Sequence, residues 1–155
     1  MTVGMLVSSQ PGNTLSVANR LREKLRGAGH SVALETVALT GERKAGTREF
    51  QLAPLPDLKP YEPLIVGSPV EAFSLSPVMA KALREIGSLE KKKVLCLITQ
   101  GFPYPWLGGH RAARQMRRLC EAKGGVVRGE AVVNWVKKDL DRRVTAAVDK
   151  LAELA

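Results

Sequence analysis

Polar, uncharged residues crowd the segment that follows the first apolar run of the chain, residues 3–7. The segment has the sequence Ser8-Ser9-Gln10-Pro11-Gly12-Asn13-Thr14. A helical pattern begins at its end, and the unpaired N–H groups and the dipole of a helix N-terminus favour a phosphate. Gly12 lets the backbone close around an anion, and Ser9, Asn13 and Thr14 can donate hydrogen bonds without adding a repelling carboxylate. The segment therefore predicts a phosphate-binding loop, with simple helix capping by Asn13 or Thr14 as the plainer alternative.

Two later segments, residues 67–73 and 99–106, carry most of the aromatic side chains. The chain has seven Phe, Tyr and Trp residues, and four of them, Phe73, Phe102, Tyr104 and Trp106, lie in these segments. Aromatic rings beside a phosphate site can stack on a planar ligand. Packing of the loops onto the domain is the alternative. Together the three segments predict a planar, phosphorylated ligand.

The sequence gives little support for metal binding or for catalysis by a serine or cysteine nucleophile. The two cysteines and two histidines show no metal-ligand spacing, so no metal site is expected. Cys96 lies inside an apolar run and is expected to be a buried thiol. No serine occupies a G-x-S-x-G elbow, and no side chain is assigned a catalytic role.

The elements that must position these segments are strands and helices in alternation. Continuous apolar or alternating runs predict strands at residues 3–7, 31–39, 64–67, 94–98 and 126–135. Apolar stripes at helical spacing begin at Thr14, Met79, Ala112 and Leu140, and Ser76-Pro77 is a helix start. Residues 40–63, rich in proline, predict an irregular crossover or a short, poor helix. The pattern is typical of an α/β protein with a doubly wound, five-stranded parallel sheet of order 2-1-3-4-5.

Length and composition fit one domain over residues 1–155. Hydrophobic residues make up 45% of the chain and charged residues 25%, which are globular values. No apolar run approaches the length of a membrane span or a signal-peptide core, so we expect a soluble, cytoplasmic protein without a membrane partner.

The motifs resemble those of a known group. Ser9-x-x-Gly12-Asn13-Thr14 resembles the phosphate loop of flavodoxins, [ST]-x-T-G-N-T. Val66-Gly67-Ser68-Pro69-Val70 with Ser76-Pro77-x-Met79 resembles the flavin loop of flavodoxin-like NAD(P)H-dependent FMN reductases. Residues 99–109 occupy the place of the third flavin loop in both families. The resemblance covers nearly the whole chain in element order and implies a flavodoxin-like fold that binds FMN.

The resemblance also implies roles for individual residues. The phosphate of FMN would be held by Ser9, Gln10, Gly12, Asn13 and Thr14. The isoalloxazine ring would be bordered by Ser68, Pro69, Val70 and Phe73, and contacted by Thr99, Gln100, Gly101 and Trp106. The flavin would carry the redox chemistry, and the protein would tune it through hydrogen bonds, charge and solvent access.

The charge of the chain is the second functional signal. Its 24 Lys and Arg exceed its 15 Asp and Glu, a formal charge of +9. Arg111, Arg114 and Arg118 recur at helical spacing and make one helix face basic. This face could be merely solvated, reach a phosphate of NADPH, dock an acidic redox partner, or bind nucleic acid. Nucleic acid is least favoured because no recognition motif accompanies the charge.

Two functional hypotheses follow. The first is an FMN-binding redox protein that exchanges electrons with a partner protein. The second is an NAD(P)H-dependent reductase of FMN, a quinone or another small-molecule acceptor. A non-flavin anion-binding module on the same scaffold is a remote third, and a homodimer is compatible with each.

Overall fold

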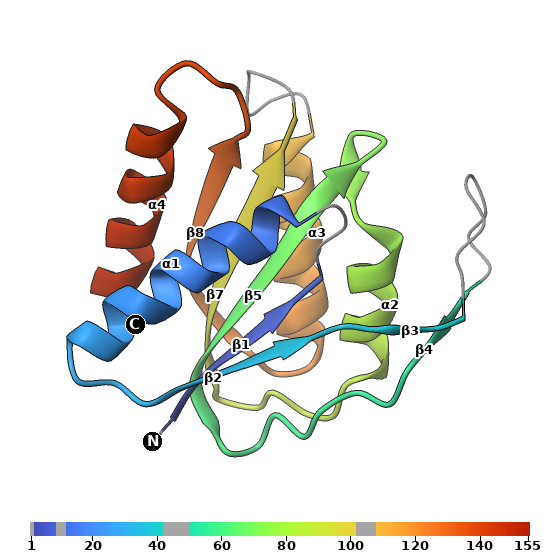
Figure 1. Ribbon diagram of the computed structural model, residues 1–155. Helices are drawn as coiled ribbons and strands as arrows, with labels where there is room; N and C mark the ends of the chain where they lie inside the picture. The colour runs from blue at the N-terminus through green and yellow to red at the C-terminus, as the bar shows by residue number, and fades with distance from the viewer. Residues whose placement is uncertain (1, 9–11, 42–49, 102–107) are drawn as a thin grey trace.

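The computed structural model describes residues 2–8, 12–41, 50–101 and 108–155, and a parallel sheet lies at its centre (Figure 1). In spatial order its main strands are β2 (Val32–Thr36), β1 (Thr2–Val7), β5 (Tyr61–Glu71), β7 (Lys93–Gln100) and β8 (Val126–Asn134). All four pairings between these neighbours are parallel. Counted along the chain this is the order 2-1-3-4-5, so the predicted flavodoxin-like, doubly wound sheet is confirmed.

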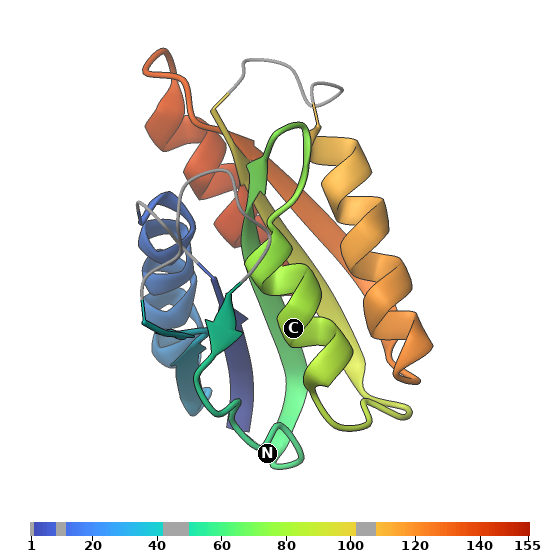
Figure 2. The same ribbon diagram turned by 90° about the vertical axis from the view of Figure 1, so that its right-hand side faces the viewer.

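Helices cover both faces of the sheet. One face carries α1 (Asn13–Gly27) and α4 (Leu140–Leu154), and the other carries α2 (Pro77–Glu85) and α3 (Gly109–Ala122) (Figures 1 and 2). The predicted stripes are the buried faces: on α2, for example, Met79, Ala82 and Leu83 are fully buried. The start of α2 also agrees with the sequence, because Ser76 occupies the N-cap and Pro77 the first helical position.

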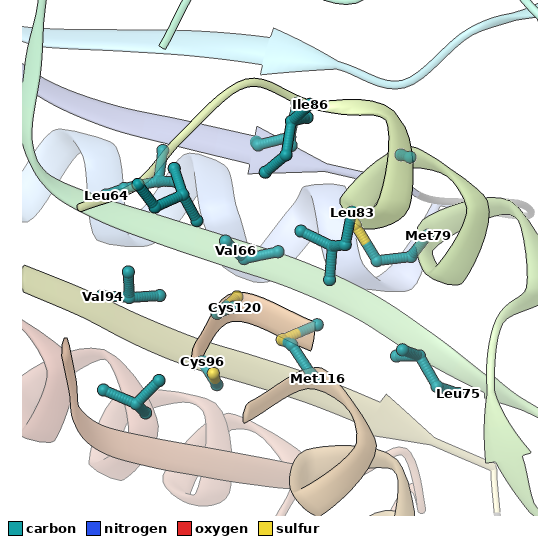
Figure 3. Close-up of a cluster of buried hydrophobic side chains, with 14 of the residues drawn as sticks. Leu64, Val66, Leu75, Met79, Leu83, Ile86, Val94, Cys96, Met116 and Cys120 are labelled. Atoms are coloured by element: carbon teal, nitrogen blue, oxygen red, sulfur yellow. The ribbon is translucent and has the colours of Figure 1, made fainter. Parts of the chain in front are cut away.

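Each face has its own hydrophobic core. The α1/α4 core joins Leu21 and Leu25 of α1 to Val144 and Leu151 of α4 across the sheet residues of that side. The α2/α3 core contains both cysteines, and Cys96 is buried as predicted (Figure 3). A strand buried on both faces has no polar side to present, which explains why these strands are continuous apolar runs in the sequence.

The crossover from β2 to β5 corrects the predicted strand over residues 31–39, whereas its described part is largely irregular, which is one of the two alternatives predicted for residues 40–63. The predicted strand over residues 31–39 divides into β2 and the two-residue β3 (Leu39–Thr40), which pairs antiparallel with β4 (Gln51–Leu52). No helix forms in the described part of the crossover, residues 37–41 and 50–60; residues 42–49 lie outside the description. Its apolar side chains serve the core instead: Leu58 is buried in the α2/α3 core, and Leu52 and Leu55 pack against it.

The third strand of the sheet is longer than predicted. The sequence places a strand at residues 64–67 and a loop after it, but β5 continues to Glu71 and pairs antiparallel with β6 (Ser74–Leu75). Ala72 and Phe73 form the two-residue turn with φ of 49° and 63°. Because both central residues have positive φ, the turn follows the right-handed twist of the strands. The predicted loop is therefore a β-hairpin, called here the β5–β6 hairpin.

No helix in the described part of the chain is long and apolar enough to cross a membrane.

Candidate functional site

The site predicted from the sequence lies at the carboxyl edge of the sheet. From β1 the chain crosses to β2 on one side, whereas β5 and the later strands lie on the other side of β1. Parallel sheets of this kind bind ligands outside the strand ends at such a reversal. The start of α1, the β5–β6 hairpin and the end of β7 all meet this edge (Figure 1).

The N-terminus of α1 has the geometry of an anion site. Its first intrahelical hydrogen bond runs from Ser16 N to Gly12 O at 2.9 Å, so the amides of Asn13 and Thr14 have no acceptor within the helix. No described side chain caps this end, and the first turn, all of it described, holds no acidic residue. Gly12 has φ of 119°, and a Cβ placed on it would meet no described atom within 4 Å. Among the described residues, nothing therefore occupies the position that a side chain at Gly12 would take.

Thr14 and Thr99 are joined to each other beneath this edge. Their hydroxyl oxygens lie 2.7 Å apart, although the residues are 85 positions apart in the chain, and both side chains are buried. A hydroxyl can donate once and accept twice, so the pair keeps one hydrogen for a further acceptor. The bond ties the first turn of α1 to the end of β7.

The β5–β6 hairpin packs against the start of α3. A Cβ on Gly108 would lie 2.8 Å from Phe73 Cα and 2.9 Å from Val70 Cγ1, so only a glycine permits this approach. Within the hairpin Ser68 is fully buried, and its hydroxyl donates to Pro69 O at 3.0 Å. Phe73 at the turn is half exposed, an uncommon position for so large an apolar side chain.

The ends of β7 and β8 add two amides. Gln100 is buried, and its Oε1 would lie 2.2 Å from a Cβ on Gly109, so its side chain lies directly against the first residue of α3. Asn134 pairs in register with Gln100, and its buried Oδ1 has no hydrogen-bond partner among the described residues. Sequence reasoning missed Asn134 as a candidate. The signal was a polar residue at the end of the fifth strand, because only the ends of the first, third and fourth strands were considered.

The structure thus brings most of the predicted residues to one edge. Those it describes there are Gly12, Asn13, Thr14, Ser68, Pro69, Val70, Phe73, Thr99, Gln100 and Gly101. Ser9, Gln10 and Trp106 lie outside the described residues, as do Phe102 and Tyr104. Among the described ten, four polar residues are buried: Thr14, Ser68, Thr99 and Gln100.

The side chains at this edge suit binding more than proton transfer. Hydroxyls and amides donate and accept hydrogen bonds but do not titrate near neutral pH. Elsewhere, burial raises the pKa of the Cys96 thiol and raises that of Cys120 to about 12, which keeps both neutral and unreactive. No group of metal-ligating side chains occurs among the described residues.

Solved structures with the same fold include flavodoxins. A flavodoxin of Streptococcus pneumoniae TIGR4 superposes with a TM-score of 0.67 at 17% identity, covering 100% of both chains. Oxidised flavodoxin 2 of Bacillus cereus gives 0.65 at 18% identity over 99% of each chain. A flavoprotein of Lactobacillus acidophilus NCFM, solved in complex with FMN, gives 0.64 at 15% identity over 91% of this chain and 97% of that one. No protein-family model and no curated protein sequence matches the chain. The chain has the flavodoxin-like fold.

Proposed function

We propose that the protein binds FMN at the carboxyl edge of its sheet and acts in electron transfer. The observation that carries the proposal is the start of α1: no described side chain caps the amides of Asn13 and Thr14, no described atom lies within 4 Å of a Cβ added at Gly12, and the first turn holds no carboxylate. Such a helix end fits the phosphate of FMN. The FMN complex of the structurally similar Lactobacillus acidophilus flavoprotein supports the same assignment.

The remaining described residues would hold the flavin ring. The hydroxyl hydrogen left over from the Thr14–Thr99 pair offers a hydrogen bond at the strand ends, where Gln100 of β7 also lies. Val70 and the half-exposed ring of Phe73 offer an apolar wall. When bound, FMN supplies one- or two-electron redox chemistry. The protein's part is to orient the ring and to exclude water from one side of it.

The electron donor and acceptor belong to the same proposal. An acidic redox partner protein suits a chain of net charge +9, because opposite charge accelerates encounter. The alternative is an NAD(P)H-dependent reductase of FMN, a quinone or another small acceptor, favoured by the exposed Arg111 and Arg118 near the hairpin. A homodimer and a cytoplasmic location remain predictions, and nucleic acid remains the least favoured partner.

The test is a titration of FMN with apo-protein in which the quenching of flavin fluorescence is measured. The proposal predicts stoichiometric quenching at micromolar concentrations. An absence of quenching there would contradict both the electron carrier and the reductase. If FMN binds, NADPH alone is then added under anaerobic conditions. Loss of the visible absorbance of the bound flavin would assign the reductase, and an unchanged spectrum would assign the carrier.

A further inference from the structure

A concave site lies outside the edge just described. A hollow of about 890 Å³ opens between α2, α3 and the β5–β6 hairpin, which Figure 2 shows side by side. It is on the α2/α3 face of the sheet, whereas α1 lies on the other face. None of the described residues assigned to the FMN site lines it. Its volume falls within the range of small-molecule sites, roughly 300–1,000 Å³.

Positive charge dominates the rim of the hollow. Lys81 and Arg84 come from α2, and Arg111 and Arg118 come from α3, whereas Glu71 is the one carboxylate among the described lining residues. Arg111 and Arg118 are two helical turns apart, a spacing of about 10 Å along the axis. The cations therefore extend along the hollow rather than gathering at one point. That distribution suits a chain of several phosphates better than a single one.

The arginines are available to a ligand. Among the described residues no ion pair involves Arg84, Arg111 or Arg118, although Arg117, one position from Arg118, pairs with Glu121 at 2.8 Å. Like charges left unpaired around a concavity repel one another, and a polyanion removes that repulsion. Guanidinium groups also match phosphate oxygens in bidentate geometry.

Hydrogen bonds join the elements around the hollow, and part of its surface is apolar. Gln115 of α3 accepts a hydrogen bond from Leu75 N at 2.8 Å and donates to Ser74 Oγ at 3.4 Å, which fixes the hairpin to the helix. Lys81 donates to Phe50 O at 2.7 Å and lies 5.2 Å from the centre of the Phe50 ring, so the ring is held at the mouth. Leu75 and Leu119 complete an apolar surface on which a planar base can rest.

We propose that this hollow is a binding site for a nucleotide with two or more phosphates, its phosphates on Arg111 and Arg118 and its base against Phe50 and Leu119. The site is independent of FMN binding. The shared chemistry is a base and a pyrophosphate, which either a nucleoside triphosphate or a nicotinamide dinucleotide can supply.

The experiment is calorimetric titration of the full chain, saturated with FMN where FMN binds, using ATP, NADPH, AMP and tripolyphosphate as separate probes. We expect ATP or NADPH to bind more tightly than AMP, because AMP has one phosphate, and more tightly than tripolyphosphate, because it has no base. The tighter of ATP and NADPH identifies the source. Absence of heat with both at millimolar concentration would overturn the proposal.

Matched variants locate the site. Arg111→Gln and Arg118→Gln should each weaken nucleotide binding about tenfold, the loss of one charge-assisted contact. The control is Arg114→Gln on the same helix, an exposed arginine that does not line the hollow, and its affinity should stay within about twofold of the wild type. An equal loss in all three variants would show a general charge effect and overturn the assignment.

Two further outcomes are informative. If polyglutamate binds and the nucleotides do not, the hollow receives an acidic polypeptide and the nucleotide proposal is wrong. FMN affinity should be unchanged in Arg111→Gln and Arg118→Gln, so a failure of the FMN proposal and a failure of this one give different results. Circular dichroism verifies that each variant is folded.

Discussion

The two helix pairs that cover the sheet use their charges in opposite ways. Between α1 and α4, Arg20 contacts Asp141 at 3.1 Å and Thr145 at 2.8 Å, and Lys24 contacts Asp149 at 2.7 Å. Between α2 and α3 the described residues form no such pair, and four cations surround a hollow instead. Both pairs sit on fully buried cores of similar character. The charged side chains between α1 and α4 thus help to hold these helices together, whereas we propose that those around the hollow bind a ligand.

The largest expected effect is the loss of stability on truncating a core leucine, and comparing it between the two faces tests whether their cores are equally well packed. Leu21 of α1 and Leu83 of α2 are both fully buried, one in each core. Leu21→Ala and Leu83→Ala should each lower the free energy of unfolding by about 2–5 kcal/mol, because each removes buried methyl groups and leaves a cavity. Urea denaturation measures both. A difference of more than about 2 kcal/mol between them would show that the faces differ in packing as well as in charge.

The next largest effect is a loss of stability at alkaline pH. It arises from the α2/α3 face alone, because both cysteines lie in that core. Burial raises the pKa of Cys120 from 9.0 to about 12, so between these values the unfolded chain releases a proton that the folded protein keeps. Stability is therefore complete below pH 9 and falls as the pH rises. By pH 10 the free energy of unfolding should drop by about 1.4 kcal/mol from this thiol.

Urea denaturation between pH 8 and pH 10 tests this dependence in the wild type and in Cys120→Ala. The variant should show a fall smaller by that amount, whatever its stability at pH 8. Identical pH dependence in the two proteins would mean that the Cys120 thiol ionises as readily in the folded state as in the unfolded chain.

The smallest expected effect is a change in the free energy of unfolding that has opposite signs for charge substitutions in the two helix pairs. Asp149→Lys breaks an exposed ion pair and should lower the free energy of unfolding by about 0.5 kcal/mol. Arg118→Glu places a carboxylate among unpaired cations and should raise the free energy of unfolding by a similar amount, about 0.5 kcal/mol. Both differences should shrink in 1 M salt, where screening is nearly complete. Destabilisation by Arg118→Glu would indicate that the cations around the hollow are already compensated.

The sequence predicted the sheet well because its signal is local. A parallel strand buried on both faces is an uninterrupted apolar run, and the bounds of α4 agree with the stripe from Leu140 to Leu154. The β5–β6 hairpin escaped prediction because its turn residues, Ala72 and Phe73, have positive φ without the Asn or Gly that usually signals such a turn. The two-residue strands β3 and β4 are likewise too short to leave a pattern.

The sequence predicted which segments meet at the carboxyl edge of the sheet, but not the contacts of their side chains. Strand ends and glycines indicate which loops meet at one edge. Whether a given hydroxyl faces that edge depends on partners distant in the chain, as with Thr14 and Thr99, which bond across 85 positions. The only sequence signal of the hollow was the helical spacing of Arg111, Arg114 and Arg118. The fold separates these three, since Arg111 and Arg118 line the hollow and Arg114 does not.

The most direct test of the FMN site compares two glycines at opposite ends of α1. Gly12 and Gly29 have φ of 119° and 94°, and neither has a described atom within 4 Å of an added Cβ. Alanine at either position should therefore cost a similar amount of stability, about 1–2 kcal/mol.

Only Gly12 adjoins the amides that we assign to the phosphate. The dissociation constant of FMN, measured by fluorescence quenching, should rise at least about tenfold in Gly12→Ala and stay unchanged in Gly29→Ala. Equal FMN affinity in both variants and the wild type would contradict the assignment of the phosphate to the start of α1.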